Sequence, residues 1–111
     1  MERLLGPSAS LHSPHLLDIE VTHALRRLVQ REDITVVRAG QALADFSLLH
    51  IERHGHQALT ARIWQLRDSM TAYDGAYVAL AEALDAPLVT CDARLARAHG
   101  HRARIEIVAY L

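Results

Sequence analysis

The stretch of sequence that decides the fold runs over residues 71–92 and reads TAYDGAYVALAEALDAPLVTCD. Its first half carries apolar side chains three and four residues apart, a spacing that predicts an amphipathic helix beginning at Thr71. Its second half holds a short apolar run, Leu88–Thr90, that predicts a buried strand. Asp74 therefore lies at the start of a helix and Asp92 just beyond the end of a strand. In an α/β fold such positions gather at the edge of the sheet where chemistry is usually found.

Short strands and helices alternate along the rest of the chain. Strands are predicted at residues 10–12, 48–51 and 105–108, and helices begin at Ser13-Pro14, at Thr35, at His56 and at Asp92. This alternation favours a layered α/β domain, with a short, mostly parallel sheet flanked by helices. The length of 111 residues predicts a single domain over residues 1–111.

The composition narrows the classes of function. No apolar run approaches the roughly 20 residues that a membrane span needs, so no membrane association is expected. The formal net charge is -1 and all 12 basic residues are Arg, so an RNA-binding surface would have to be a local cluster of arginines. The single cysteine, Cys91, cannot form an internal disulfide, which favours a cytoplasmic protein.

A third acid, Glu20, stands in an unexpected place on a predicted helix. On a helical wheel it falls within the apolar arc between Leu16 and Ala24, four residues away on either side. A buried carboxylate without a partner is costly, so the position needs an explanation. Glu20 can be a functional acid, or it can pair with Arg27 or another arginine. Asp18 lies at the opposite margin of the apolar stripe, where it is expected to be solvated.

Asp74 and Asp92 each have a structural explanation as well as a functional one. Thr71 and Asp74 are spaced like the two members of a capping box, with Asp in place of Glu. Asp92 is placed to be the N-cap of the helix that follows it. A cap and a metal ligand are compatible, because an ion can approach the same helix end from outside.

Taken together, the three acids predict a metal site. If folding brings Glu20, Asp74 and Asp92 within about 4 Å of one another, each pair of carboxylates repels by about 4 kcal/mol at an effective dielectric constant of about 20. Such a cluster persists only where protons or a cation neutralise it. A hard divalent ion bound by carboxylate oxygens is the natural expectation.

Two other features give weaker indications of chemistry. His54 and His56 suggest a metal site, but no further ligands follow at the spacing that zinc sites show, so the sequence does not favour one. Cys91 has no activating base beside it in the sequence and is expected to be a buried thiol at the end of a strand.

Three segments carry a resemblance to a known family. Residues 16–27 read LLDIEVTHALRR, residues 71–82 read TAYDGAYVALAE and residues 88–95 read LVTCDARL. Glu20 and Asp74 are 54 residues apart, and Asp74 and Asp92 are 18 apart. In order and separation these segments resemble the second-helix, central and strand-end motifs of the PIN-domain ribonuclease toxins of the VapC type, over nearly the whole chain.

The resemblance implies a PIN-like α/β fold and an endoribonuclease, the toxin component of a type II toxin–antitoxin system. It implies Mg²⁺ or Mn²⁺ as the cofactor, held by Glu20, Asp74 and Asp92, and a metal-activated water that attacks the RNA. Thr90 would be the hydroxyl residue that orients the site through a hydrogen bond. The implied partners are the RNA substrate, a cognate antitoxin protein and a second copy of the chain in a homodimer.

The beginning of the chain departs from the family pattern. Family members begin with a strand that carries the first catalytic Asp, followed by a helix, whereas Met1–Leu5 is similar to the end of that helix. The first central strand is therefore expected to be missing, and we expect the true start to lie upstream. The alternative is a catalytically weakened or inactive PIN-like module that binds an antitoxin or RNA without cutting.

Overall fold

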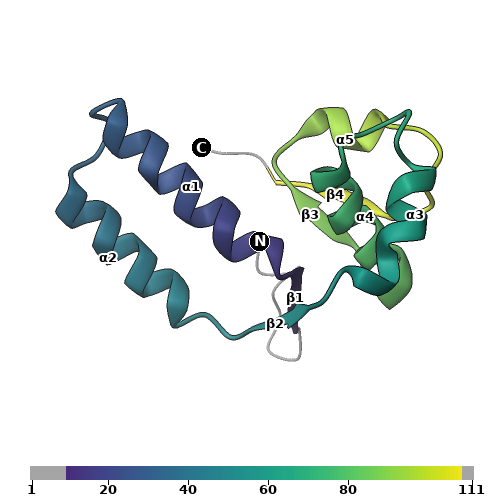
Figure 1. Cartoon of the computed structure of the whole chain (residues 1–111), viewed down its shortest axis with the longest axis horizontal. Helices are drawn as coiled ribbons and strands as arrows, with labels where there is room; N and C mark the ends of the chain where they lie inside the picture. Colours follow the sequence, from purple (N-terminus) through teal and green to yellow (C-terminus); the bar gives the residue numbers. More distant parts are fainter. Residues whose placement is uncertain (1–9, 109–111) are drawn as a thin grey trace. The chain divides into compact units, whose positions relative to one another are not determined.

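The computed structural model describes residues 10–108 (Figure 1). The described chain divides into two compact units, an N-terminal unit of residues 10–54 and a C-terminal unit of residues 55–108. The helix end expected at residues 4–7, and with it the expectation of a missing first strand, lies outside the described residues.

The N-terminal unit is a helical hairpin with a short parallel strand pair at its ends. Its elements are β1 (Leu11–Pro14), α1 (Leu16–Gln30), α2 (Val36–Ser47) and β2 (Ile51–His54). The two long helices lie side by side (Figure 1). β1 and β2 run parallel in the register Leu11↔Ile51 to Pro14↔His54, which joins the two ends of the unit.

Two predicted boundaries in this unit are wrong, and strand pairing explains both. Ser13 and Pro14 were expected to start a helix, but they belong to β1 and are buried. The amide of His15 donates to the carbonyl of His54 at 3.0 Å, so the strand pairing continues past Pro14 before α1 begins. The strand expected at residues 48–51 begins only at Ile51 and runs to His54. Local signals could not show which residues find a partner strand.

The start of α2 is where the sequence predicted it, at Thr35. The Thr35 hydroxyl accepts a hydrogen bond from the amide of Arg38 at 3.0 Å, which satisfies one of the free N–H groups at the helix start. Thr35→Ala should therefore lower the free energy of unfolding by about 1 kcal/mol. Thr35→Ser keeps the capping oxygen and should cost less than about 0.5 kcal/mol. Urea unfolding of the two variants checks this, and equal losses would contradict a capping role.

The C-terminal unit is built around one central helix. Its elements are η1 (Gln57–Leu59), α3 (Thr60–Gln65), α4 (Ala72–Leu84), β3 (Leu88–Thr90), α5 (Ala93–Arg97) and β4 (Ile105–Ile107). β3 and β4 pair in parallel, with Leu88 opposite Ile105. The helix expected to start at His56 is instead a short 3-10 turn followed by α3. The start of α4, strand β3 and the position of β4 agree with the sequence prediction.

The core of this unit is made where α4 meets its neighbours. Leu66, Val78 and Leu95 are buried together, and Met70 and Leu88 are among the side chains that pack against them. Most of the α4 side chains that face inward are small. Gly75 shows why: a Cβ there would lie 3.2 Å from Cγ2 of Ile63, so α3 and α4 can approach this closely only where α4 lacks a side chain.

The described residues therefore form an α/β structure of five α-helices and two short parallel strand pairs, as the sequence predicted. Between residues 10 and 108, none of the helices combines the length and apolar character needed to span a bilayer.

Candidate active site

Asp74 lies in the first turn of α4, half-buried. Thr71 is the N-cap of this helix, and its hydroxyl accepts from the amide of Asp74 at 3.2 Å. The cap therefore uses the hydroxyl of Thr71 and the backbone of Asp74. A carboxylate in the first turn also interacts favourably with the positive end of the helix dipole, so this position stabilises a negative charge.

Asp92 lies two residues beyond β3 and is the N-cap of α5, as the structural explanation predicted. Its Oδ1 accepts from the amide of Arg94 at 2.9 Å. The hydroxyl of Thr90, the last residue of β3, accepts from the amide of Asp92 at 3.0 Å. Thr90 thus holds the backbone from which the Asp92 side chain projects, and its part in orienting a metal site stays a prediction.

Arg94 forms an ion pair with Asp92. Its Nε donates to Oδ1 of Asp92 at 3.1 Å and its Nη2 to Oδ2 at 3.0 Å, a forked ion pair. These hydrogen bonds lower the pKa of Asp92. The pKa of Arg94 is raised, chiefly by Asp92 and, to a smaller extent, by the charge of Asp74. Arg94 contacts Asp92 directly, whereas Asp74 acts on it only through its charge.

Sequence reasoning did not single out Arg94 as a member of the site. The signal that could have identified it is the spacing: an arginine two residues after an N-cap aspartate can fold back onto the carboxylate that caps its own helix.

Glu20 lies on α1 in the N-terminal unit, where it is half-buried. The neighbouring acid Asp18 was expected to be solvated; its side chain is 43% exposed, and it also has a partner, which the sequence did not predict. Arg53 donates to both of its carboxylate oxygens, from Nε to Oδ2 at 2.8 Å and from Nη2 to Oδ1 at 2.8 Å, and these bonds lower the pKa of Asp18. Asp18 pairs with Arg53 across the unit, and Glu20 is the acid of α1 that the sequence predicted to serve the site. Its convergence with Asp74 and Asp92 stays a prediction.

A comparison with protein families supports the resemblance that the three motifs carry. The family model of the PIN domain matches residues 1–100.

The chain belongs to the PIN-domain family.

Curated relatives are of the VapC type. The chain is 45% identical to Ribonuclease VapC12 of Mycobacterium tuberculosis over 107 residues, which cover 96% of this chain and 81% of the relative. It is 48% identical to Ribonuclease VapC1 of the same species over 106 residues, 95% of this chain and 79% of the relative. With Ribonuclease VapC9 the identity is 44% over 93 residues, 84% of this chain and 73% of the relative. The resemblance to VapC-type PIN domains that the three motifs carry is confirmed.

Among the residues near the PIN-domain acids, Cys91 corrects a prediction. The thiol was expected to be buried at the end of β3, but Cys91 is exposed and free. The chain bends at this residue between Thr90 and Asp92, which turns the side chain outward. Since the hydrogen bond from Asp92 to Thr90 spans Cys91, the bend and the exposure have the same cause.

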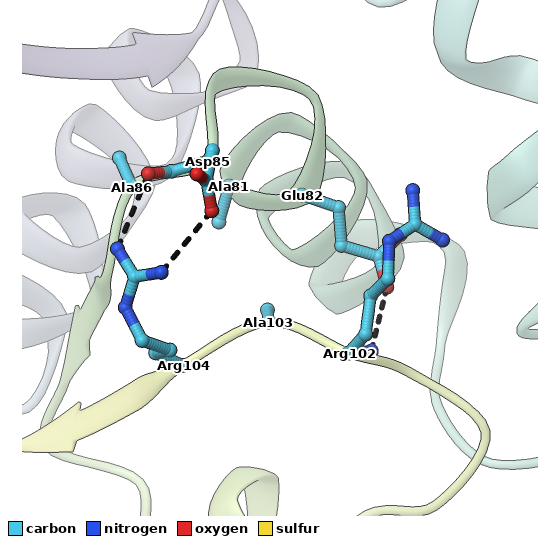
Figure 2. Close-up of a pocket in the computed structure, with 7 residues that line it drawn as sticks. All are labelled: Ala81, Glu82, Asp85, Ala86, Arg102, Ala103 and Arg104. Atoms are coloured by element: carbon cyan, nitrogen blue, oxygen red, sulfur yellow. Dashed lines mark hydrogen bonds and ion pairs between the residues drawn. The ribbon is translucent and has the colours of Figure 1, made fainter.

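A second polar cluster of the PIN domain lies at the other end of α4 and has a structural role. Figure 2 shows Glu82 and Asp85 facing Arg102 and Arg104 around a small cavity of about 60 Å³. The amide of Arg102 donates to Oε2 of Glu82 at 2.8 Å, and Arg104 pairs with Asp85 at 3.1 Å. A cavity of this size holds at most a few waters. The cluster therefore ties the segment before β4 to the end of α4, and it is not a substrate site.

Glu82 also pairs with Arg62 of α3 within the same cluster. Arg62 donates to both carboxylate oxygens of Glu82, from Nε at 2.7 Å and from Nη2 at 3.0 Å. The Glu82 side chain is only 2% exposed. Its hydrogen bonds, those from Arg62 first, lower its pKa from 4.5 to about 2. Glu82 is thus ionised because three donors replace the water it has lost.

Proposed function

We propose that this chain is an endoribonuclease, the toxin of a toxin–antitoxin pair, and that it cuts RNA with the help of Mg²⁺ or Mn²⁺. The observation that supports the proposal is the placement of Asp74 in the first turn of α4 and of Asp92 just after β3, in a chain whose VapC-type relatives are named ribonucleases. Those relatives are matched over about four-fifths of their own length.

The proposed metal ligands are Glu20, Asp74 and Asp92. The bound ion would supply a Lewis acid and a water of lowered pKa for attack on the phosphate. The donor set fits this ion, because Asp74 and Asp92 offer carboxylate oxygens at positions where the fold favours negative charge. Thr90 holds the backbone of Asp92 and so fixes where this carboxylate points.

Arg94 has a proposed part in the same chemistry. Its side chain is 84% exposed and reaches Asp92 from the solvent side. If Asp92 held such an ion, the Arg94 guanidinium would be free to make the same forked contact with a phosphate oxygen pair of the RNA. Asp92 would thus exchange Arg94 for the divalent ion, and its negative charge would be neutralised in both states.

The partners follow from the same proposal. We expect a cognate antitoxin, an RNA substrate, a homodimer and a cytoplasmic location, with residues 1–111 acting as one domain. The carboxylates of the site need a cation before they can bind RNA phosphates. A protein segment with its own arginines could pair with these carboxylates and block the site, which suits control by an antitoxin.

The rival function is a module that binds an antitoxin or RNA without cutting. The forked ion pair between Asp92 and Arg94 favours this non-cleaving module, because the charge of Asp92 is already neutralised by a residue of the chain itself. Divalent ions distinguish the two functions. Unchanged partner binding in EDTA, together with no cleavage in Mg²⁺ or Mn²⁺, would establish the module and overturn the nuclease.

Removal of the metal should abolish cleavage. With a fluorescently labelled cellular RNA mixture, we expect cleavage in Mg²⁺ or Mn²⁺, background rates in EDTA, and recovery when the divalent ion is restored. The reason is that the proposed ion would supply the water of lowered pKa that attacks the phosphate. Cleavage that continues at full rate in EDTA would show that the metal mechanism is wrong.

A further inference from the structure

The β1–β2 pair places three metal-binding side chains on one of its faces. His12 and Glu52 are direct partners in the parallel register, and His54 follows Glu52 by two residues. Side chains two residues apart on a strand point to the same face of a sheet. His12 and His54 are 42 residues apart in the sequence, so sequence spacing could not suggest that they lie together.

The donor atoms of these three residues are close enough to share one ion. Nδ1 of His12 lies 2.9 Å from Nε2 of His54 and 3.5 Å from Oε2 of Glu52. One donor atom from each of the three residues falls within a group in which no two are more than 4.8 Å apart. In a tetrahedral zinc site, with ligand bonds of about 2.0–2.1 Å, neighbouring ligand atoms are about 3.3 Å apart. The two measured distances lie on either side of that value, so small side-chain rotations suffice.

The surroundings of His12 prepare its Nδ1 to act as a ligand. Oγ of Ser10 lies 2.8 Å from the other ring nitrogen, Nε2. In the tautomer whose proton is on Nε2, His12 donates to Ser10 and keeps a lone pair on Nδ1. Such a hydrogen bond from the distant ring nitrogen is the usual support of a metal-bound histidine. In the hydrogen bond between Nδ1 of His12 and Nε2 of His54 one nitrogen donates and the other accepts. For both to ligate a cation, the proton on Nε2 of His54 would move to Nδ1 of the same ring, which leaves a lone pair on each ligating nitrogen.

We infer that His12, Glu52 and His54 form a binding site for one divalent transition-metal ion, with Zn²⁺ as the representative ion. Two imidazoles and one carboxylate suit zinc and its neighbours, whereas magnesium prefers oxygen ligands. The Glu52 side chain is 65% exposed and that of His12 is 26% exposed, so an ion can enter from solvent and keep a water as its fourth ligand. Bound there, it would link β1 to β2 and close the two ends of the N-terminal unit.

This site is separate from the proposed nuclease metal. None of its ligands is Glu20, Asp74 or Asp92, and its donor set is nitrogen-rich. The two ions can therefore be distinguished in one experiment, and failure of either proposal leaves the other standing.

Calorimetric titration of the full chain with Zn²⁺, in the presence of excess Mg²⁺, tests the inference. We expect one saturable Zn²⁺ site per chain. His12→Asn and His54→Asn should each weaken binding by at least about 10-fold, since loss of even a supporting residue typically costs about 10- to 100-fold. Glu52→Gln changes an exposed side chain with little risk to the fold and should also weaken binding.

Two controls make the result specific. His50→Asn removes an exposed histidine of the same unit that lies outside the cluster, and Asp92→Asn removes a proposed nuclease ligand; both should leave the Zn²⁺ affinity unchanged. Absence of one-to-one binding, or wild-type affinity in the His12, His54 and Glu52 variants, would overturn the site. An equal loss in His50→Asn would show that Zn²⁺ binds surface histidines without selection and would also overturn it.

Discussion

Replacing Asp74 by Asn should lower the rate of RNA cleavage by at least about 100-fold while the fold is retained. Metal-ion stabilisation of a phosphoryl transition state is worth several kcal/mol, and each 1.36 kcal/mol corresponds to a factor of about ten in rate. Asn keeps the shape of the side chain but removes the charge that would hold the ion. The helix cap is preserved, because Thr71 accepts from the backbone amide of residue 74 and not from its side chain.

The measurement is the value of kcat/KM for a labelled RNA at saturating Mg²⁺, with circular dichroism to show that the fold is unchanged. Asp68→Asn is the matched control, since Asp68 is an exposed acid of the same unit outside the proposed site. We expect the control to cleave at the wild-type rate. If Asp74→Asn retains that rate, or if both variants lose it equally, Asp74 is not a metal ligand.

Replacing Glu82 by Gln should lower the free energy of unfolding by about 3 kcal/mol at pH 7. Removing one partner of a buried ion pair typically costs about 3–5 kcal/mol, and the lower end applies because the Arg62 side chain is 27% exposed. Asp85→Asn is the matched control on the same helix end. Asp85 also pairs with an arginine, but it is 91% exposed, so its loss should cost less than about 0.5 kcal/mol.

The same carboxylate predicts how stability depends on pH. The pKa of Glu82 is lowered from 4.5 to about 2 in the folded state, so its contribution is fully present above pH 4.5 and is lost as the pH falls towards 2. The difference in stability between wild type and Glu82→Gln should therefore shrink across this interval. Urea unfolding at a series of pH values measures it. A difference that stays constant down to pH 2, or equal losses in the Glu82 and Asp85 variants at pH 7, would show that the buried pair is not the cause.

Local signals in the sequence were sufficient to predict a helix or strand wherever its boundary depends on residues within the element itself. Thr71 and Thr35 each cap the helix that follows, and the apolar run Leu88–Thr90 forms a strand as predicted. These features depend on residues within one helical turn or one strand. The positions of Asp74 and Asp92 at element ends were predictable for the same reason.

Features that depend on a distant partner were not predictable in this way. Ser13-Pro14 has the signature of a helix start, but pairing with β2 places it in a strand. Asp18 was expected to be solvated, yet its partner Arg53 lies 35 residues further on. The cluster around His12 likewise needs a strand register that no local pattern contains. The PIN family motifs gave information on the fold that the local signals did not contain, because members of a family share a fold as well as a local sequence pattern.

The fork between Asp92 and Arg94 has a consequence for how a nuclease of this design responds to its surroundings. If Asp92 is a ligand of the proposed divalent ion, that ion has to compete with the guanidinium of Arg94, and the occupancy of the site would rise only at ion concentrations high enough to displace it. Added monovalent salt screens the resident pair, and an approaching polyanion draws the guanidinium away. RNA itself would then help to load the catalytic ion, and the enzyme would hold its cofactor most tightly when substrate is already at hand.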